Sequence, residues 1–159
     1  MISDQEFLYG AALLKLINFG NKVTLVHYSY IHSSLYLIET DNTKSAVLFK
    51  LSKKPKSAWS FSFSEQEDVA LKTVRDQHLN VSVFLALVCH RDGICCIAME
   101  RVLDILDNRE NISGQYISVS RRPRGSYHIS GPGREQMERT VPQSDWPRII
   151  ISKPEKNYE

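Results

Sequence analysis

The stretch SAVLFKLSKKPKSAWSFSF, residues 45–63, contains the most regular β-type pattern in the chain. Its first part, SAVLFKLS, is rich in apolar and β-branched residues and predicts a strand. In its last part, AWSFSF, aromatic and serine side chains alternate, which predicts a second strand with its three aromatic rings on one buried face. The residues between them predict a turn, because Pro55 cannot donate to a β ladder. We therefore predict a hairpin beside the core.

The predicted turn and its flanks are basic. Four lysines lie in this stretch: Lys50, Lys53, Lys54 and Lys56. No acidic residue lies between Asp41 and Glu65, so an anionic partner is expected at this surface. The alternative is a solvated hairpin tip, whose lysines keep a sheet edge from pairing with other chains.

Length and composition predict one globular domain. A chain of 159 residues is the usual size for a single domain, and 42% hydrophobic with 24% charged residues is ordinary for a folded protein. The formal net charge of +2 is small for a dedicated DNA-binding module. A nucleic-acid site must therefore come from local clusters of basic residues.

The cysteines and the apolar runs bear on the compartment. No apolar run reaches the roughly 18 residues that span a bilayer, and the start MISDQEF lacks the features of a signal peptide. Cys89, Cys95 and Cys96 are odd in number and two of them are adjacent, which is typical of free thiols in a reducing compartment. We predict a cytoplasmic protein without a membrane partner.

Helix starts and β patterns predict the other elements. Ser3 with Glu6 and Ser64 with Glu67 form capping-box patterns, so helices are expected over residues 3–18 and from residue 64 onward. A short helix is expected over residues 99–107. Further strands are expected at residues 22–31, 35–40, 81–89 and 94–98.

This order predicts an α/β (α+β) fold. We expect an antiparallel or mixed sheet of about five to six strands with helices packed on it, formed by residues 1–110. Residues 111–150 are rich in Gly, Pro, Ser and Arg and predict an irregular, basic extension packed on the core, with short strands at 117–120 and 127–129. Residues 151–159 have no periodicity and predict a loose tail.

The extension contains a second basic segment, SRRPRGSYHISG, residues 120–131. Arg121, Arg122 and Arg124 lie beside Tyr127 in it. Arginine binds phosphates and carboxylates in a bidentate manner, so this segment is the better candidate for anion binding. The alternative is an exposed loop that pairs with nearby acids.

Cysteine and histidine patterns do not predict a metal site or a nucleophile. Zinc sites use paired ligands, whereas the adjacent Cys95 and Cys96 in a strand point to opposite faces. A hydrolase based on Cys89 or Cys95 would need a base and an oxyanion hole, and no pattern indicates either. No P-loop, G-x-G-x-x-G or G-x-S-x-G motif is present.

The element order, Lys50 in the third strand and the helix entry SFSEQE resemble the restriction-endonuclease-like core, the PD-(D/E)xK nuclease fold. In that family an Asp and a Glu hold a divalent metal, and a Lys two residues after the Glu orients the nucleophile. Segments such as SAWSFSF and VFLALVCHRDGICCI are also similar to bacterial proteins without an assigned activity.

The resemblance implies that Asp41 stands for the first acid and Lys50 for the lysine. The position two before Lys50 is Leu48, which cannot bind a metal. The missing carboxylate could come from a residue elsewhere in the chain. The candidates are Glu39, Glu65 and Glu67.

Three hypotheses follow. The first is a non-catalytic protein with a degenerate nuclease-like fold that binds nucleic acid or another polyanion through Lys50 to Lys56 and Arg121 to Arg124, with no cofactor. The second is an Mg²⁺-dependent nuclease that uses Asp41, Lys50 and Glu65 or Glu67. The third is a protein-interaction or regulatory subunit whose open strands and apolar HRDGICCI hairpin dock a protein partner.

Overall fold

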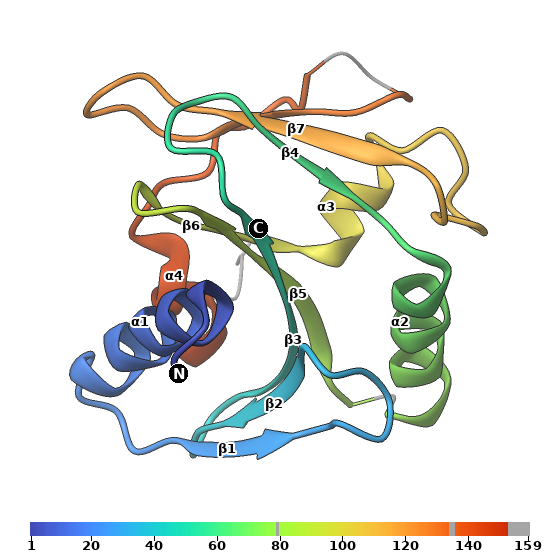
Figure 1. Cartoon of the computed structure of the whole chain (residues 1–159). Helices are drawn as coiled ribbons and strands as arrows, with labels where there is room; N and C mark the ends of the chain where they lie inside the picture. Colours follow the sequence, from blue (N-terminus) through green and yellow to red (C-terminus); the bar gives the residue numbers. More distant parts are fainter. Residues whose placement is uncertain (79, 134–135, 153–159) are drawn as a thin grey trace, which may run out of the picture.

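The computed structural model describes residues 1–78, 80–133 and 136–152, which form four helices and eight strands in an α+β fold (Figure 1). The helices are α1 (Asp4–Asn18), α2 (Glu65–Gln77), α3 (Met99–Leu103) and α4 (Asp145–Ile151). The strands are β1 (Thr24–His27), β2 (Leu35–Glu39), β3 (Lys44–Ser52), β4 (Trp59–Ser62), β5 (Ser82–Cys89), β6 (Gly93–Ala98), β7 (Tyr116–Ser120) and β8 (His128–Ser130). The predicted fold class is confirmed.

Five strands form the main sheet, in the order β1-β2-β3-β5-β6. Strands β1, β2 and β3 are antiparallel neighbours, and β5 is parallel to β3, with the connection running through β4 and α2. Strand β6 returns antiparallel to β5 after the turn at Asp92 and Gly93, which confirms the hairpin expected for the segment HRDGICCI. The apolar strand β5 is therefore interior, as its composition predicted.

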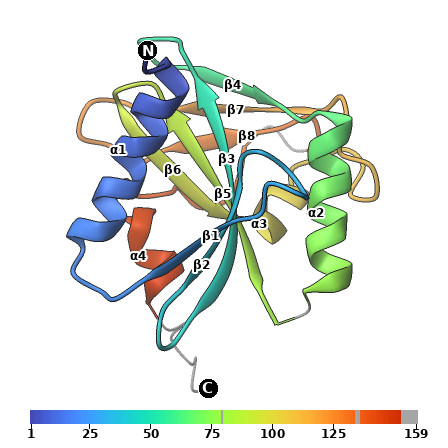
Figure 2. The same cartoon turned by 60° about the horizontal axis from the view of Figure 1, so that its bottom comes forward.

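Helices and a second sheet cover the two faces of the main sheet (Figures 1 and 2). Helices α1 and α4 lie on one face, where Leu16, Phe49 and Trp146 belong to one buried cluster. Helices α2 and α3 and the second sheet lie on the other face, where the second cluster includes Leu48 and Trp59. This second layer positions the candidate site.

The predicted hairpin between the strands at residues 45–63 is wrong. Strand β3 already has β2 on one side and β5 on the other, so neither of its edges can accept β4. Residues 53–58 instead carry the chain into a second layer, where β4 pairs antiparallel with β7 in a three-stranded sheet of order β4-β7-β8. The buried aromatic face of β4 is confirmed, because Trp59, Phe61 and Phe63 are all buried.

Helix starts match the prediction, and some element ends do not. Ser3 Oγ accepts from the Glu6 N–H, and Ser64 and Glu67 form the full reciprocal capping box. Strand β1 is shorter than predicted because the N–H groups of Ile31 and His32 bond the Tyr28 carbonyl and close a turn. Helix α3 ends at Leu103, four residues earlier than expected.

The end of the chain is more ordered than predicted. Strands β7 and β8 pair, as expected, and their apolar residues Ile117, Val119 and Ile129 join the core beside the main sheet. Helix α4 was not predicted. The Trp146 indole N–H donates to the Ala12 carbonyl at 3.1 Å and so anchors α4 to α1. The tail prediction falls almost entirely on residues 153–159, outside the described residues.

Candidate nucleic-acid interface

The lysine turn, residues 53–58, is held in shape by its own backbone contacts. The Trp59 indole N–H donates to the Lys54 carbonyl at 2.8 Å, and the Lys54 ammonium donates to the Ala58 carbonyl at 2.7 Å. Lys53 and Lys56 are exposed and make no ion pair with any described residue. Trp59 is only 1% exposed, so its ring is not available for a base.

Arg121, in the arginine loop of residues 121–126, is used internally. Its guanidinium donates two hydrogen bonds to the Asp92 carboxylate, from Nε to Oδ2 at 2.9 Å and from Nη2 to Oδ1 at 2.8 Å. The Tyr127 hydroxyl donates to the same carboxylate at 3.0 Å, and the Tyr127 ring is fully buried. The hydrogen bonds from Arg121 hold the pKa of Asp92 below its usual value, and burial raises the pKa of Tyr127. Arg121 and Tyr127 therefore fix the loop on the β5–β6 turn.

Arg122 and Arg124 are the free cations of the arginine loop. Both are exposed, and neither makes an ion pair with a described residue. The Gly125 N–H bonds the Arg122 carbonyl at 2.9 Å and closes the turn that carries them, with Arg124 in a left-handed conformation at φ 65°.

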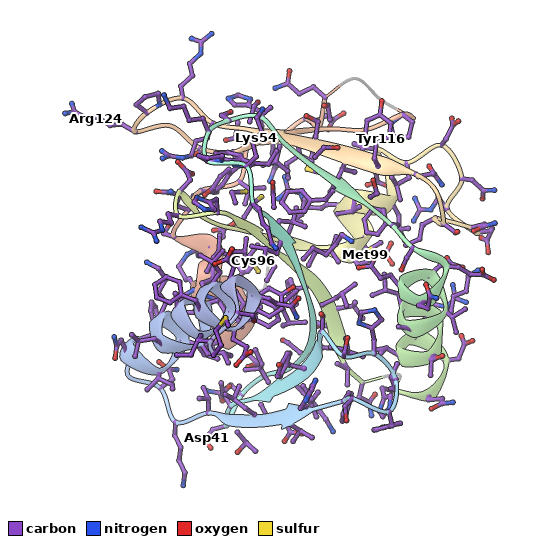
Figure 3. The ribbon with its side chains drawn as sticks, in the orientation of Figure 1. Asp41, Lys54, Cys96, Met99, Tyr116 and Arg124 are labelled. Atoms are coloured by element: carbon purple, nitrogen blue, oxygen red, sulfur yellow. The ribbon has the colours of Figure 1, made fainter. Side chains whose placement is uncertain are left out.

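Strand pairing brings the lysine turn and the arginine loop together. Trp59 at the start of β4 lies opposite Val119 near the end of β7. The Arg121 N–H donates to Ser57 Oγ at 3.0 Å. Figure 3 shows Lys54 and Arg124 in the layer that the second sheet forms. We call the exposed cations of this end the basic rim: Lys53, Lys54, Lys56, Arg122 and Arg124.

A hollow of about 680 Å³ opens beside the basic rim. We call it the serine hollow; its lining is Ser57, Ser120, Arg121, Arg122, His128, Ile129, Ser130 and Gln136. The Gln136 amide nitrogen lies 2.7 Å from His128 Nδ1. Since an amide nitrogen only donates, Nδ1 is the acceptor and Nε2 carries the proton of the neutral ring. His128 thus presents an N–H donor.

Lys50 and Glu67, two predicted catalytic residues, form an ion pair beneath the second sheet. The Lys50 ammonium lies 2.8 and 2.7 Å from the two carboxylate oxygens of Glu67 and 2.6 Å from the Ser62 carbonyl. It also lies 5.2 Å from the centre of the Phe63 ring. Only 9% of the Lys50 side chain and 10% of the Glu67 side chain are exposed. Lys50 is therefore unavailable for surface phosphate contacts.

The other two predicted catalytic residues are not brought to this pair. Asp41 follows β2, and six strand residues of about 3.3 Å each separate the start of β3 from Lys50. Figure 3 shows Asp41 at the opposite end of the molecule from Lys54. Glu65 is exposed in the first turn of α2.

The pocket beside Lys50 offers few ligands for a divalent metal. The pair lines a pocket of about 410 Å³, and Glu67 is the only carboxylate among the lining residues. Both of its oxygens already accept from Lys50. Within residues 1–78, 80–133 and 136–152, no group of three or more His, Cys, Asp or Glu side chains could hold a metal.

The cysteines and the β5–β6 hairpin belong to the core. Cys89, Cys95 and Cys96 are free and buried, and burial raises the pKa of each thiol. Ile94 and Ile97 are buried as well. The apolar side chains of the hairpin that the third hypothesis offered to a protein partner are therefore covered by the chain itself, and Arg91 at its tip is exposed.

Sequence reasoning did not identify the serine hollow or the role of Asp92. The alternation in YISVS, residues 116–120, is the signal that could have shown a polar strand face. The partner of Arg121 is 29 residues away, and no local pattern indicates it.

Comparisons with known proteins gave no family. The chain matches no protein-family model, no curated protein and no solved structure. In the part of the chain that the structure describes, no helix has the length and apolar character needed to cross a bilayer. The fold and the site define an α+β protein whose basic rim is formed jointly by the lysine turn and the arginine loop.

Proposed function

We propose that this protein binds nucleic acid, or another polyanion of the same charge pattern, through the basic rim and without catalysis. The observation that carries the proposal is the β4–β7 pairing, which places two basic segments from distant parts of the sequence at one end of one sheet. Charge gathered in this way attracts phosphates more strongly than the net charge of +2 indicates.

Two cations that were predicted to bind the anion are paired inside the protein instead, which supports the choice of the basic rim as the binding surface. Lys50 is paired with Glu67 and Arg121 with Asp92, so neither adds free charge. The rim cations retain their charge for a partner, because none of them forms an ion pair with a described residue. Exposed arginine and lysine side chains of this kind contact phosphates and fix the position of the strand without reading its sequence.

The proposed fold relationship is that of a degenerate nuclease-like core. Helix α1, the antiparallel strands β1 to β3, helix α2 and the parallel strand β5 follow the order on which that resemblance rests. Leu48, at the position of the family's metal-binding acid, is fully buried in the core. A reducing compartment such as the cytoplasm is consistent with the three free thiols.

Binding to a labelled oligonucleotide tests the proposal. Fluorescence anisotropy should show saturable binding that weakens steeply as salt rises from about 50 to 200 mM, because each neutralised phosphate releases counterions. If five rim cations contact a single strand, the slope of log K against log salt should approach about −3.5. A salt-independent affinity would contradict the proposal.

The second candidate, a metal-dependent nuclease, has one observation in its favour: Lys50 and Glu67 meet beside a pocket that Tyr9 and Ser34 also line. Incubation of DNA and RNA with the protein and Mg²⁺ or Mn²⁺ tests it. Cleavage that is lost in a Lys50→Ala variant still folded by thermal unfolding, and kept in the surface variant Lys22→Ala, would favour a nuclease, and intact substrate would reject it.

A further inference from the structure

The outer face of the second sheet is polar and carries no acid among its described strands. Residues of β4, β7 and β8 alternate between the core and this face. The core side takes Trp59, Ile117, Val119 and Ile129. The alternation leaves the following side chains on the outer face: Ser60, Ser62, Tyr116, Ser118, Ser120, His128 and Ser130. A strand of phosphates would meet no charge repulsion on it.

One tyrosine ring stands on this face. Tyr116 is 55% exposed, and it lies opposite Ser62 at the end of the sheet away from the basic rim. Figure 3 shows Tyr116 and Arg124 toward the two ends of this layer. An exposed tyrosine on a flat polar sheet offers a surface on which a base can stack.

The serine hollow, at the rim end, supplies donors. The side chains of Ser120 and Ser130 make no hydrogen bond with a described residue, so their hydroxyl groups can donate to an anion. Ser57 Oγ accepts from the Arg121 N–H and keeps its own proton free. Together with the His128 N–H and the Arg122 guanidinium, these groups match the oxygens of a phosphate. The volume of about 680 Å³ falls within the range of sites for small organic groups, which is about 300–1,000 Å³.

The spacing of these features suits a short run of nucleotides. Ser120 lies four positions after Tyr116 along β7, which corresponds to about 13 Å at about 3.3 Å per residue. A stacked strand rises about 3.4 Å per nucleotide along its axis, so about four nucleotide steps cover this distance. A base on Tyr116 and a phosphate in the hollow can therefore belong to one strand.

We propose that the outer face of β4-β7-β8 is a platform for single-stranded nucleic acid, with a base stacked on Tyr116 and a phosphate in the serine hollow. This inference rests on the proposed function and adds the strand state of the ligand. Charge alone favours a duplex, which carries twice the phosphate density. Stacking on Tyr116 requires an unpaired base, so the platform should bind a single strand in preference to a duplex.

The experiment compares an oligo-dT strand of about 12 nucleotides with the dA·dT duplex of the same length, by fluorescence anisotropy at one salt concentration. The full chain is used as wild type, Tyr116→Ala, Tyr116→Phe and, as a control, Tyr30→Ala. Tyr30 is 73% exposed on the β1–β2 connection, outside the second sheet. Thermal unfolding of each variant checks that the fold is kept.

We expect the wild type to bind the single strand more tightly than the duplex. Tyr116→Ala should weaken single-strand binding about 5-fold or more, whereas Tyr116→Phe and Tyr30→Ala should retain it. Equal or tighter duplex binding, with no effect of Tyr116→Ala but a loss in the rim variant Arg122→Ala/Arg124→Ala, would overturn the platform and leave the proposed function standing. Absence of binding to both probes at low salt would overturn both.

Discussion

The hydroxyl oxygen of Ser57 accepts a hydrogen bond from the backbone N–H of Arg121 at 3.0 Å and joins two segments that lie 64 residues apart in the sequence. This bond lies two positions beyond the last β4–β7 pair, Trp59 with Val119, and holds the lysine turn against the arginine loop. The basic rim therefore depends on tertiary structure.

Removing this hydroxyl should loosen the rim without changing its charge, and it also removes one donor from the serine hollow. We expect Ser57→Ala to lower the free energy of unfolding by about 0.5–1.5 kcal/mol and to weaken oligonucleotide binding several-fold. Urea denaturation and anisotropy measure the two effects. Ser29→Ala, at an exposed serine of the β1–β2 connection, is the control and should change neither. Unchanged affinity in Ser57→Ala would show that the rim does not need this contact.

The Lys50–Glu67 pair should be important for stability. Lys50→Met leaves the Glu67 carboxylate nearly buried without its cation, and we expect a loss of about 3–5 kcal/mol in the free energy of unfolding. The double variant Lys50→Met/Glu67→Met removes both charges and should recover part of this loss. Chemical denaturation of both variants measures the difference. A single variant as stable as the wild type would contradict this assignment.

Asp92 should give the protein a specific acid sensitivity. Its pKa is lowered by the hydrogen bonds from Arg121, so the folded state binds fewer protons than the unfolded state near the ordinary Asp pKa of about 3.9. The contribution of ionised Asp92 to the free energy of unfolding is complete above the ordinary Asp pKa and is lost as the pH falls below it. Asp92→Asn should cost about 1.5–3 kcal/mol at neutral pH, and the gap to the wild type should narrow in acid. A gap independent of pH would exclude the ion pair as its cause.

Two glycines should respond to alanine in opposite directions. A Cβ at Gly133 would lie 2.3 Å from the Leu106 carbonyl oxygen, so Gly133→Ala must push backbone apart and should destabilise the fold. Gly10, in the middle of α1, has no atom within 4 Å of a Cβ, and Gly10→Ala should stabilise by about 0.5–1 kcal/mol. Thermal unfolding distinguishes them. A stabilised Gly133→Ala variant would contradict the packing of residue 133 against residue 106.

Much of the fold follows from local patterns in the sequence. The capping residues Ser3 and Ser64 begin α1 and α2, and the Asp92-Gly93 turn joins β5 to β6. Strict alternation in β4 correctly predicted a buried aromatic face. These features depend on residues near one another in the chain, which a pattern can show.

The remainder depends on contacts between distant residues. The sequence pattern of residues 45–63 does not reveal that β5 takes the second edge of β3 and displaces β4 to another sheet. Helix α4 contains Pro147 and a short apolar run, and its position depends on the contact of Trp146 with Ala12. For the same reason, charge alone could not separate Arg121, which pairs with Asp92, from Arg122, which remains free.

The salt dependence of oligo-dT binding by paired rim variants tests the central claim most directly. Lys53→Ala/Lys56→Ala and Arg122→Ala/Arg124→Ala should each reduce the slope of log K against log salt by about 1.4, and Lys15→Ala/Lys22→Ala should leave it unchanged. That result would show one surface built from both segments. An equal loss in all three variants, or no loss in either rim variant, would contradict it.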